Sequence, residues 1–523
     1  MKLLIYIVSL QIIIGCAQQS MLTGGEKDMT PPTLIQEKTI PANYSTHFSS
    51  KTIQLNFDEY IQLKDQKKNF FVNPPINEIS LEEKGKVILI HIGEPLKENT
   101  TYTFNFGSSI QDITENNPLR DFKYVISTGN FIDSNFIDGI VYDAFLKSPM
   151  ENIRVFLYEK KLDSLTENTI PSYMGFSNNS GNFMLNNLKA GQYYLMAVED
   201  KNGNNLPDPK SEKIAFDTSF VASLPLNDSS DKNILHLFMH DMPLKILEKK
   251  YTPPGRFDVV FNKKLALTDI EVAQQNYYIQ QKNYSSDTFS FWVDSIPNSP
   301  LSFDLAIEKE SFLKELKINT YQPSSKDTTL TFKEKNLNNL HPGESLQIKF
   351  NHPLKKINSE KLLFLIDSVE TKKKYTFNGE LWSFNIPEAA NSSLELLAEP
   401  GAFESIYGFI SDSIHLIFSQ KKSSSYGNIY LNVNCEKCDS FIIQLIKQDI
   451  IIQSFNCSSA LKDTINMCNP GDYKLRVIHD LNKDGVWTTG DFNANAQPEP
   501  VYYYNEPMEI KPGWSIDIHW VIQ

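Results

Sequence analysis

Positive charge is scarce in this sequence relative to negative charge, and this limits the partners it can bind. The 50 Lys and Arg residues are outnumbered by 63 Asp and Glu residues, so the net charge is −13. Proteins bind DNA and RNA mainly by neutralising phosphates with basic side chains. We therefore expect no nucleic-acid partner.

The motifs of common catalytic sites are also missing. The sequence has no Gly-x-Ser-x-Gly, no glycine-rich phosphate loop and no His-Glu-x-x-His. These motifs place a nucleophile, a phosphate or a metal where the chemistry needs it. We therefore expect a protein that is not an enzyme, with an unrecognised hydrolase as the remaining alternative.

Long apolar runs are absent after residue 16, so we expect no membrane-spanning helix beyond it. The one apolar run follows Met1 and Lys2, is too short to span a bilayer permanently, and ends at Gly15 and Cys16. A small residue before the Cys suits a signal peptidase. This pattern resembles a bacterial lipoprotein signal; an ordinary secretory signal or a first strand is the alternative.

The lipoprotein resemblance implies a compartment and an anchor. Residues 1–15 would be the signal peptide, and Cys16 would become the lipid-bearing N-terminus in the outer membrane, on either its periplasmic or its exterior face. Residues 16–30 lack periodicity, which predicts a flexible tether between the lipid and the first domain.

Cysteine is rare, and apart from Cys16 it is confined to one region. An even number of cysteines in an exported protein favours disulfides. Free thiols and a zinc site are the alternatives, although the second Cys-x-x-Cys of a zinc ribbon is missing. The four disulfide candidates are Cys435, Cys438, Cys457 and Cys468.

Helical periodicity is nearly absent, whereas strand-like alternation is frequent. Ile53, Leu55 and Phe57 alternate with polar residues, and a later strand of the same kind ends before Ser127-Thr128-Gly129. Such short strands, punctuated by Pro, Gly and Asn, predict β-sandwiches. The order of prolines, a strand ending in Phe-Asp-Glu, a Thr-Tyr strand and Ser-Thr-Gly resembles the bacterial Ig-like domain of S-layer-type proteins. The resemblance implies an Ig-like domain at 31–130.

A repeat with a constant offset of 280 residues is the clearest internal signal. Residues 190–204 match residues 470–484 without a gap, and both contain Gly-x-Tyr-x-Leu followed by Asp-x-Asn. This pattern resembles transthyretin-like, carboxypeptidase-regulatory β-sandwiches. The resemblance implies two copies of one module, at 131–225 and 421–523.

Two further sandwiches are expected between these copies. Phe257–Asn262 and Leu346–Asn351 repeat the alternating strand that ends in Phe-Asn. They predict a diverged β-sandwich at 226–325 and a diverged Ig-like β-sandwich at 326–420. The expected fold is therefore all-β, a tandem array of Ig-like and transthyretin-like β-sandwiches. The whole order resembles Ig-like-domain lipoproteins of Bacteroidota.

The repeated Asp/Asn loops carry the only spacing typical of a metal site. Hard oxygen atoms at alternate positions, with Gly at position six, suit calcium. A set of Asx turns is the alternative, because Asn-Gly and Asp-Gly are turn residues in any case. The candidate structural calcium ligands are Asp480, Asn482, Asp484, Val486 and Asp491 in the second loop and Asp200, Asn202, Asn204, Asp208 and Glu212 in the first.

These features together predict a binding protein. The expected function is a non-catalytic, lipid-anchored protein of the cell envelope, as an accessory or scaffold subunit of an outer-membrane barrel or another envelope complex. The alternative is a glycan-binding surface lipoprotein, for which the tyrosine run 502–504 offers exposed aromatic rings.

Overall fold

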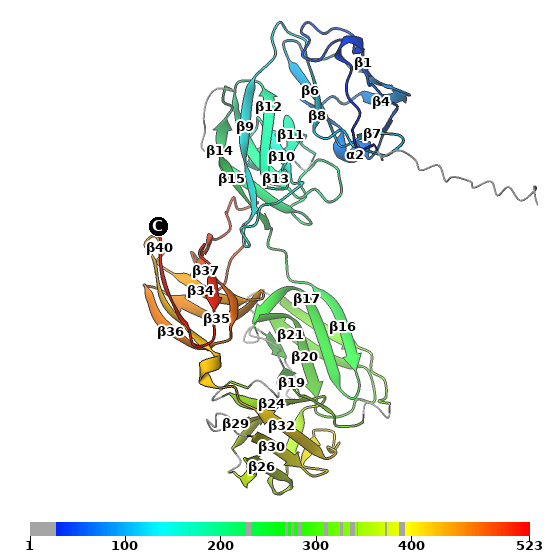
Figure 1. Ribbon diagram of the computed structural model, residues 1–523. Helices are drawn as coiled ribbons and strands as arrows, with labels where there is room; N and C mark the ends of the chain where they lie inside the picture. Colours follow the sequence, from blue (N-terminus) through cyan, green and yellow to red (C-terminus); the bar gives the residue numbers. More distant parts are fainter. Residues whose placement is uncertain are drawn as a thin grey trace, which may run out of the picture. The chain divides into compact units, whose positions relative to one another are not determined.

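The computed structural model describes residues 28–523, apart from 167, 226–231, 267–269, 273–276, 281–284, 308–311, 325–327, 335–339, 342–343, 372–373 and 386–392. Nearly all regular structure in this part is β-strand (Figure 1), which confirms the predicted all-β fold class. The chain divides into two compact units. Unit 1 comprises Met1–Met239 and Phe492–Ala496, and unit 2 comprises His240–Asp491 and Gln497–Gln523.

Module 1 is a β-sandwich in unit 1. Its sheets have the orders β1-β5-β4 and β3-β6-β8, with β2 and β7 as a separate pair. Ile53, Leu55 and Phe57 are buried, as their alternation predicted. The strands are β1(Thr52–Asn56), β2(Ile61–Leu63), β3(Phe71–Asn73), β4(Ile79–Lys84), β5(Val87–Ile92), β6(Thr101–Gly107), β7(Ile110–Asp112) and β8(Phe122–Ser127).

Module 2 follows in the same unit, with strand order β11-β10-β13-β14-β15-β9-β12. Its last strand corrects the predicted boundary at residue 225. β15 pairs in parallel with β9 and antiparallel with β14, so this module extends to Met239. The strands are β9(Asn135–Asp143), β10(Arg154–Tyr158), β11(Tyr173–Phe176), β12(Asn182–Leu188), β13(Gln192–Val198), β14(Lys213–Ala222) and β15(Asn233–Met239).

Module 3 opens unit 2 and has the sheet orders β16-β17-β20-β19 and β18-β21-β22. The predicted strand at Phe257 lies in β17, where Phe257, Val259 and Phe261 are buried in the core. The strands are β16(Ile246–Thr252), β17(Arg256–Ala266), β18(Ile270–Val272), β19(Tyr277–Gln280), β20(Ser285–Val293), β21(Leu301–Ile307) and β22(Phe312–Ile318).

Module 4 has the sheet orders β23-β24-β29-β28 and β27-β26-β30-β32, plus the pair β25-β31. The predicted strand at Leu346 lies in β24, where Leu346, Ile348 and Phe350 point into the core. The strands are β23(Phe332–Glu334), β24(Ser345–Phe350), β25(Leu354–Ile357), β26(Leu362–Ile366), β27(Val369–Glu370), β28(Tyr375–Asn378), β29(Leu381–Asn385), β30(Ser393–Ala398), β31(Phe403–Ser405) and β32(Ile414–Ser419).

Module 5 shares part of its strand pairing with module 2, although its strands form two sheets, β36-β33-β40 and β35-β34-β37-β38 with β39 beside β37. In both, the first strand pairs in parallel with the last, β9 with β15 and β33 with β40, and the second strand pairs with the third and the fifth. The strands are β33(Gly427–Cys435), β34(Phe441–Lys447), β35(Ile450–Cys457), β36(Leu461–Cys468), β37(Gly471–His479), β38(Val501–Tyr503), β39(Met508–Ile510) and β40(Ser515–Ile522).

Each module has its own hydrophobic core. Five separate clusters of buried apolar residues follow one another along the chain, one for each sandwich. Helices are short in the described ranges: η1(Gln36–Lys38), α2(Gln66–Asn69), η2(Leu162–Ser164), η5(Ser359–Lys361) and η6(Ser423–Ser425). Among these residues, none of the helices has the length and apolar character needed to cross a bilayer.

Candidate functional site

The two Asp/Asn loops fold in the same way, one after β13 and one after β37. In each loop the first Asp accepts the backbone N–H groups four and five residues later, and the Asn two positions after that Asp shares the first of these N–H groups. Asn205 and Gly485 occupy the same left-handed turn position, with φ of 59° and 78°, which Asn and Gly tolerate best. The matching bonds join Asn204 N and Asn205 N to Asp200 at 3.2 and 3.1 Å, and Asp484 N and Gly485 N to Asp480 at 3.1 and 3.2 Å.

A buried glutamate accepts backbone N–H groups from each loop. Glu212 accepts the N–H of Lys201 at 3.0 Å, and Glu499 accepts the N–H of Leu481, 280 residues further along, at 2.7 Å. Each glutamate uses its second oxygen for another N–H of the loop. Burial raises the pKa of Glu212, and the bonds from Lys201 and from residue 208 oppose that rise.

Glu499 was not singled out from the sequence, and Asp491 was the last candidate calcium ligand of this loop. The Asp491 carboxylate instead lies 3.4 Å from Nδ1 of His240. A signal for Glu499 was available in the other copy, because Glu212 directly precedes β14 and Glu499 stands two residues before β38.

The two loops differ in what neutralises the first Asp. Arg154 on β10 donates to Asp200 at 2.8 Å, and both side chains are almost fully buried. Arg154 faces Val198 across the strand pair, and the residue that faces its counterpart Ile478 is Ile442. Module 5 therefore has an apolar side chain where module 2 has a guanidinium.

The Asp480 carboxylate consequently has only neutral partners in the described part of the chain. It accepts Ser440 Oγ at 3.1 Å and two backbone N–H groups. Asn482 and Asp484 lie beside it and are hydrogen-bonded to each other at 3.0 Å. The Val486 side chain is exposed.

The calcium prediction is compatible with part of this geometry. Asp480, Asn482 and Asp484 are brought together, whereas Asp491 is not. In the first loop, Asp200, Asn202 and Asn204 are brought together by turn bonds, and Asp208 accepts Ser211 Oγ at 2.6 Å. No group of three or more His, Cys, Asp or Glu side chains in the described ranges is arranged to hold a metal ion. Calcium binding stays a prediction.

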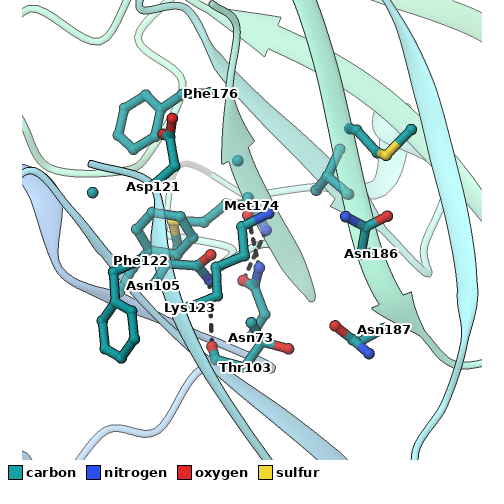
Figure 2. Close-up of a pocket in the computed structure, with 15 residues that line it drawn as sticks. Asn73, Thr103, Asn105, Asp121, Phe122, Lys123, Met174, Phe176, Asn186 and Asn187 are labelled. Atoms are coloured by element: carbon teal, nitrogen blue, oxygen red, sulfur yellow. Dashed lines mark hydrogen bonds between the residues drawn. The ribbon is translucent and has the colours of Figure 1, made fainter. Parts of the chain in front are cut away.

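A buried side-chain amide joins modules 1 and 2 of unit 1. Asn73, at the end of β3, is buried, and it donates to the carbonyl of Met174 at 2.7 Å and accepts the Met174 N–H at 2.9 Å. The amide thus imitates a paired strand residue on the edge of β11. Figure 2 shows the two bonds side by side.

Arg154 and two phenyl rings complete this junction. The guanidinium donates to the Lys68 carbonyl of module 1 at 2.8 Å and lies 4.5 Å from the centre of the Phe176 ring. The Phe71 and Phe176 rings meet edge to face at 5.7 Å. Arg154 therefore connects the first Asp/Asn loop to the neighbouring module.

A cleft of about 90 Å³ opens beside the junction. Its walls come from β3, β6 and the start of β8 on one side and from β11 and β12 on the other (Figure 2). Three phenyl rings and a group of amide, hydroxyl and charged side chains line it: Phe71, Phe122 and Phe176, with Asn73, Asn105, Asn186, Asn187, Thr103, Asp121 and Lys123.

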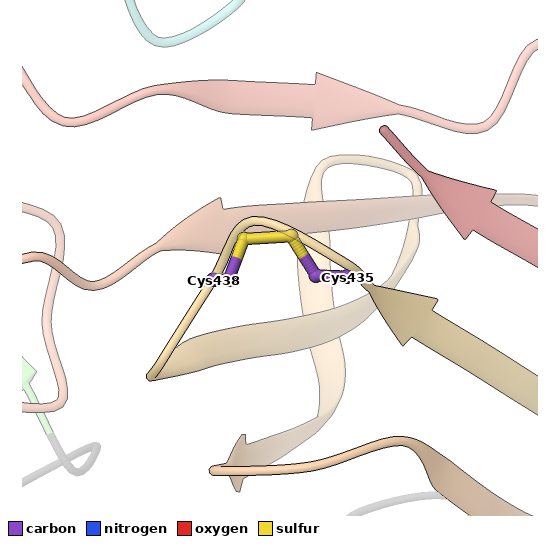
Figure 3. Close-up of a disulfide and its surroundings, with 2 residues drawn as sticks. All are labelled: Cys435 and Cys438. Atoms are coloured by element: carbon purple, nitrogen blue, oxygen red, sulfur yellow. A yellow bond between two sulfur atoms is a disulfide. The ribbon is translucent and has the colours of Figure 1, made fainter.

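The cysteines of module 5 fall into two classes. Cys435, at the end of β33, is disulfide-bonded to Cys438 in the turn that leads to β34 (Figure 3), with 5.3 Å between their Cα atoms. Cys457 and Cys468 are free thiols. Burial raises the pKa of Cys468 to about 11, and Lys447 opposes that rise.

Two sequence expectations have different outcomes. The tyrosine run 502–504 is half-buried, and Tyr504 packs against the Trp520 ring at 5.6 Å, so it does not present a free aromatic platform. Cys16 and the rest of the N-terminal signal lie outside the described residues, so lipid attachment stays a prediction.

Comparison with known proteins finds a family match for module 1. Residues 28–128 match the family model of the bacterial Ig-like domain. No curated protein matches the chain.

Solved structures resemble the chain only distantly. A Bacteroides ovatus mixed-linkage glucan utilization locus protein, SGBP-B, in complex with a heptasaccharide, is 8% identical, with 71% of this chain and 94% of that one covered and a TM-score of 0.20. The Bacillus anthracis TIE protein is 10% identical, with 95% and 76% covered and a TM-score of 0.15. BcpA, the major pilin subunit of Bacillus cereus, is 10% identical, with 75% and 99% covered and a TM-score of 0.11. At these values the similarity says nothing about function.

Proposed function

We propose that this chain is a non-catalytic, lipid-anchored binding protein of the bacterial cell envelope, acting as a scaffold or accessory subunit of an outer-membrane protein complex. One observation carries the proposal: five sandwiches follow one another in the chain, and each has a core of its own. A chain built this way presents a series of separate surfaces.

Buried polar links stiffen the array within each unit. In unit 1 the Asn73 amide joins modules 1 and 2. In unit 2 the Trp292 indole N–H of module 3 donates to Glu380 of module 4 at 2.8 Å, and both side chains are buried. Neighbouring modules held in this way can offer one composite surface to a partner, which suits a scaffold.

Attachment to the membrane would come from Cys16. The lipoprotein signal supplies more than one acyl chain at this residue, and two chains anchor a protein stably where one does not. The unperiodic residues 16–30 would then let the modules reach a partner above the membrane surface.

The test is affinity purification of the tagged chain from detergent-solubilised membranes, followed by mass spectrometry. We expect an outer-membrane or envelope protein in stoichiometric amount, and its loss when residues 421–523 are deleted although modules 1 and 2 stay folded. Recovery of the chain alone after mild cross-linking, or turnover of a glycan, peptide or ester at about 1 s⁻¹ or faster, would contradict the proposal.

Glycan binding is the second candidate function. The cleft between modules 1 and 2 favours it, because phenyl rings and amides line the same small space. Sugars present apolar C–H faces together with hydroxyl groups, so a pocket that combines both kinds of lining suits them.

A further inference from the structure

The Lys123 ammonium is the unusual group in this cleft. Its side chain lines the cavity and is half-buried, and it has no ion pair or hydrogen bond with any residue that the structure describes. Burial lowers the pKa of this lysine, and the charge of Asp121 opposes that shift without forming an ion pair. A cation that has lost water without gaining a partner raises the energy of the free protein.

Hydrogen-bonding groups surround this cation. Asn105 is buried, and its Nδ2 donates to the Thr103 carbonyl at 3.3 Å, whereas its Oδ1 accepts no bond within the described ranges. Asn186 and Asn187 stand on the opposite wall, and Asn187 Nδ2 donates to the carbonyl of residue 133 at 3.0 Å. Amides both donate and accept, which suits the hydroxyls of a sugar.

Strand addition by a peptide is disfavoured here. The N–H and C=O of Met174, on the edge strand β11, are both bonded to the Asn73 amide. An extended peptide would need those main-chain groups for a ladder. A compact ligand with its own acid group fits the remaining space better.

We propose that this cleft binds a carboxylate-bearing sugar unit, a uronic acid, whose carboxylate pairs with Lys123 while its ring packs against the phenyl side chains. The proposal deepens the glycan-binding candidate and rests on it. It does not depend on lipid attachment or on a protein partner. The cavity is small for a pocket, so it takes one unit, such as a chain end, and not an extended polysaccharide.

The test is calorimetric titration of the purified full chain with galacturonate, tetragalacturonate and the neutral maltotetraose. We expect the two acidic probes to bind with similar affinity per chain and the neutral one to bind about tenfold or more weakly, since a hydrogen bond to a charged group is lost. Lys123→Met should weaken acidic binding by the same factor. Lys64→Met, an exposed lysine of module 1 outside the cleft, should leave it unchanged.

A second variant keeps the test valid if Lys123→Met fails to fold. Met184 lines the cleft and is 52% exposed, so Met184→Trp should fill the opening and abolish binding with little effect on the melting temperature. Equal binding of acidic and neutral sugars, tighter binding of a glutamate-rich peptide, or binding that survives both variants would overturn the proposal. A negative result in the sugar titration would not affect co-purification with an envelope partner. The sugar-binding inference and the scaffold function can therefore fail independently.

Discussion

The guanidinium of Arg154 lies 2.8 Å from the carboxylate of Asp200, and neither side chain is appreciably exposed. Through this ion pair, Arg154 of β10 places a positive charge against the first Asp/Asn loop. The equivalent position in the second copy is Ile442, and there Asp480 is left with neutral donors. The two loops have the same backbone hydrogen bonds. The first Asp of the loop is paired with a cation in module 2 and only with neutral donors in module 5.

Removing the Arg154 charge should destabilise modules 1 and 2. Arg154→Met leaves Asp200 buried and unpaired and frees the Lys68 carbonyl, so we expect a loss of about 3–5 kcal/mol in the free energy of opening. Native-state hydrogen exchange of β10 and β13 measures this loss. Arg120→Met, at an exposed arginine of module 1, is the control and should change protection little. An Arg154→Met variant as well protected as the wild type would show that the pair contributes nothing.

Calcium should stabilise module 5 and not module 2. In module 2 the Arg154 guanidinium already supplies the charge that calcium would bring, whereas Asp480, Asp484 and the glutamate at 499 have no such cation in the described part of the chain. At about 10 mM calcium and a Kd of about 10⁻⁴ to 10⁻³ M, the gain is about 1.4–2.7 kcal/mol. Scanning calorimetry in calcium and in chelator measures it.

Matched variants locate the calcium effect. Asp480→Ala with Asp484→Ala should remove it, and Glu499→Gln should weaken it. Asp491→Asn should keep it, because that carboxylate faces His240 instead. If the wild type melts at the same temperature in calcium and in chelator, the second loop is a set of Asx turns and no more.

The strands and the repeat could be predicted from the sequence because both depend on local pattern. Alternation placed Ile53 and Phe257 in cores, and the constant offset of 280 residues reappears as hydrogen bonds between equivalent atoms. The alternation pattern could not reveal which strands are buried on both faces. β6 is buried on both faces, including Thr103 and Asn105, because module 2 packs against module 1 there.

The candidate site was harder to predict for the same reason. Arg154 is 46 residues from Asp200 and Glu499 is 18 residues from Leu481, and neither contact follows from a local sequence pattern. β15 was assigned to the next module because the alternation of a strand does not say which sheet it joins. The cleft beside Asn73 depends on a contact between residues 101 positions apart.

Stability of unit 1 should fall as the pH drops below neutrality. Burial lowers the pKa of His236 from 6.5 to about 4, and Lys147, whose ammonium lies 3.5 Å from Nδ1, adds to this shift. Between pH 4 and pH 6.5 the unfolded chain therefore binds a proton at this histidine that the folded chain does not bind. The contribution is complete above pH 6.5 and is lost progressively toward pH 4.

Nuclear magnetic resonance titration of the histidine ring signals checks this assignment. One histidine should titrate near pH 4, and His236→Gln should remove that signal and flatten the pH dependence of unit 1 stability. His47→Gln, at an exposed histidine of module 1, should do neither. A His236 that titrates near 6.5 would contradict the buried, neutral state.

Thiol counting tests the cysteine pairing in module 5. Alkylation of the unfolded, unreduced chain should label Cys457 and Cys468 and spare the 435–438 pair. Because the pair closes a very short loop, its replacement by serines should cost about 2 kcal/mol at most. A mass showing two disulfides, or four labelled cysteines in this module, would contradict the pairing.

Attachment to the membrane through Cys16 is the central claim, and fractionation of cells tests it most directly. Membranes from cells expressing the wild-type chain or Cys16→Ala are washed with carbonate, and the mature N-terminal peptide is analysed by mass spectrometry. We predict that the wild type stays in the pellet with a lipid-modified Cys16 at its N-terminus and that Cys16→Ala is released. A wild-type chain that is washed off, or that keeps residues 1–15 without lipid, would contradict the account.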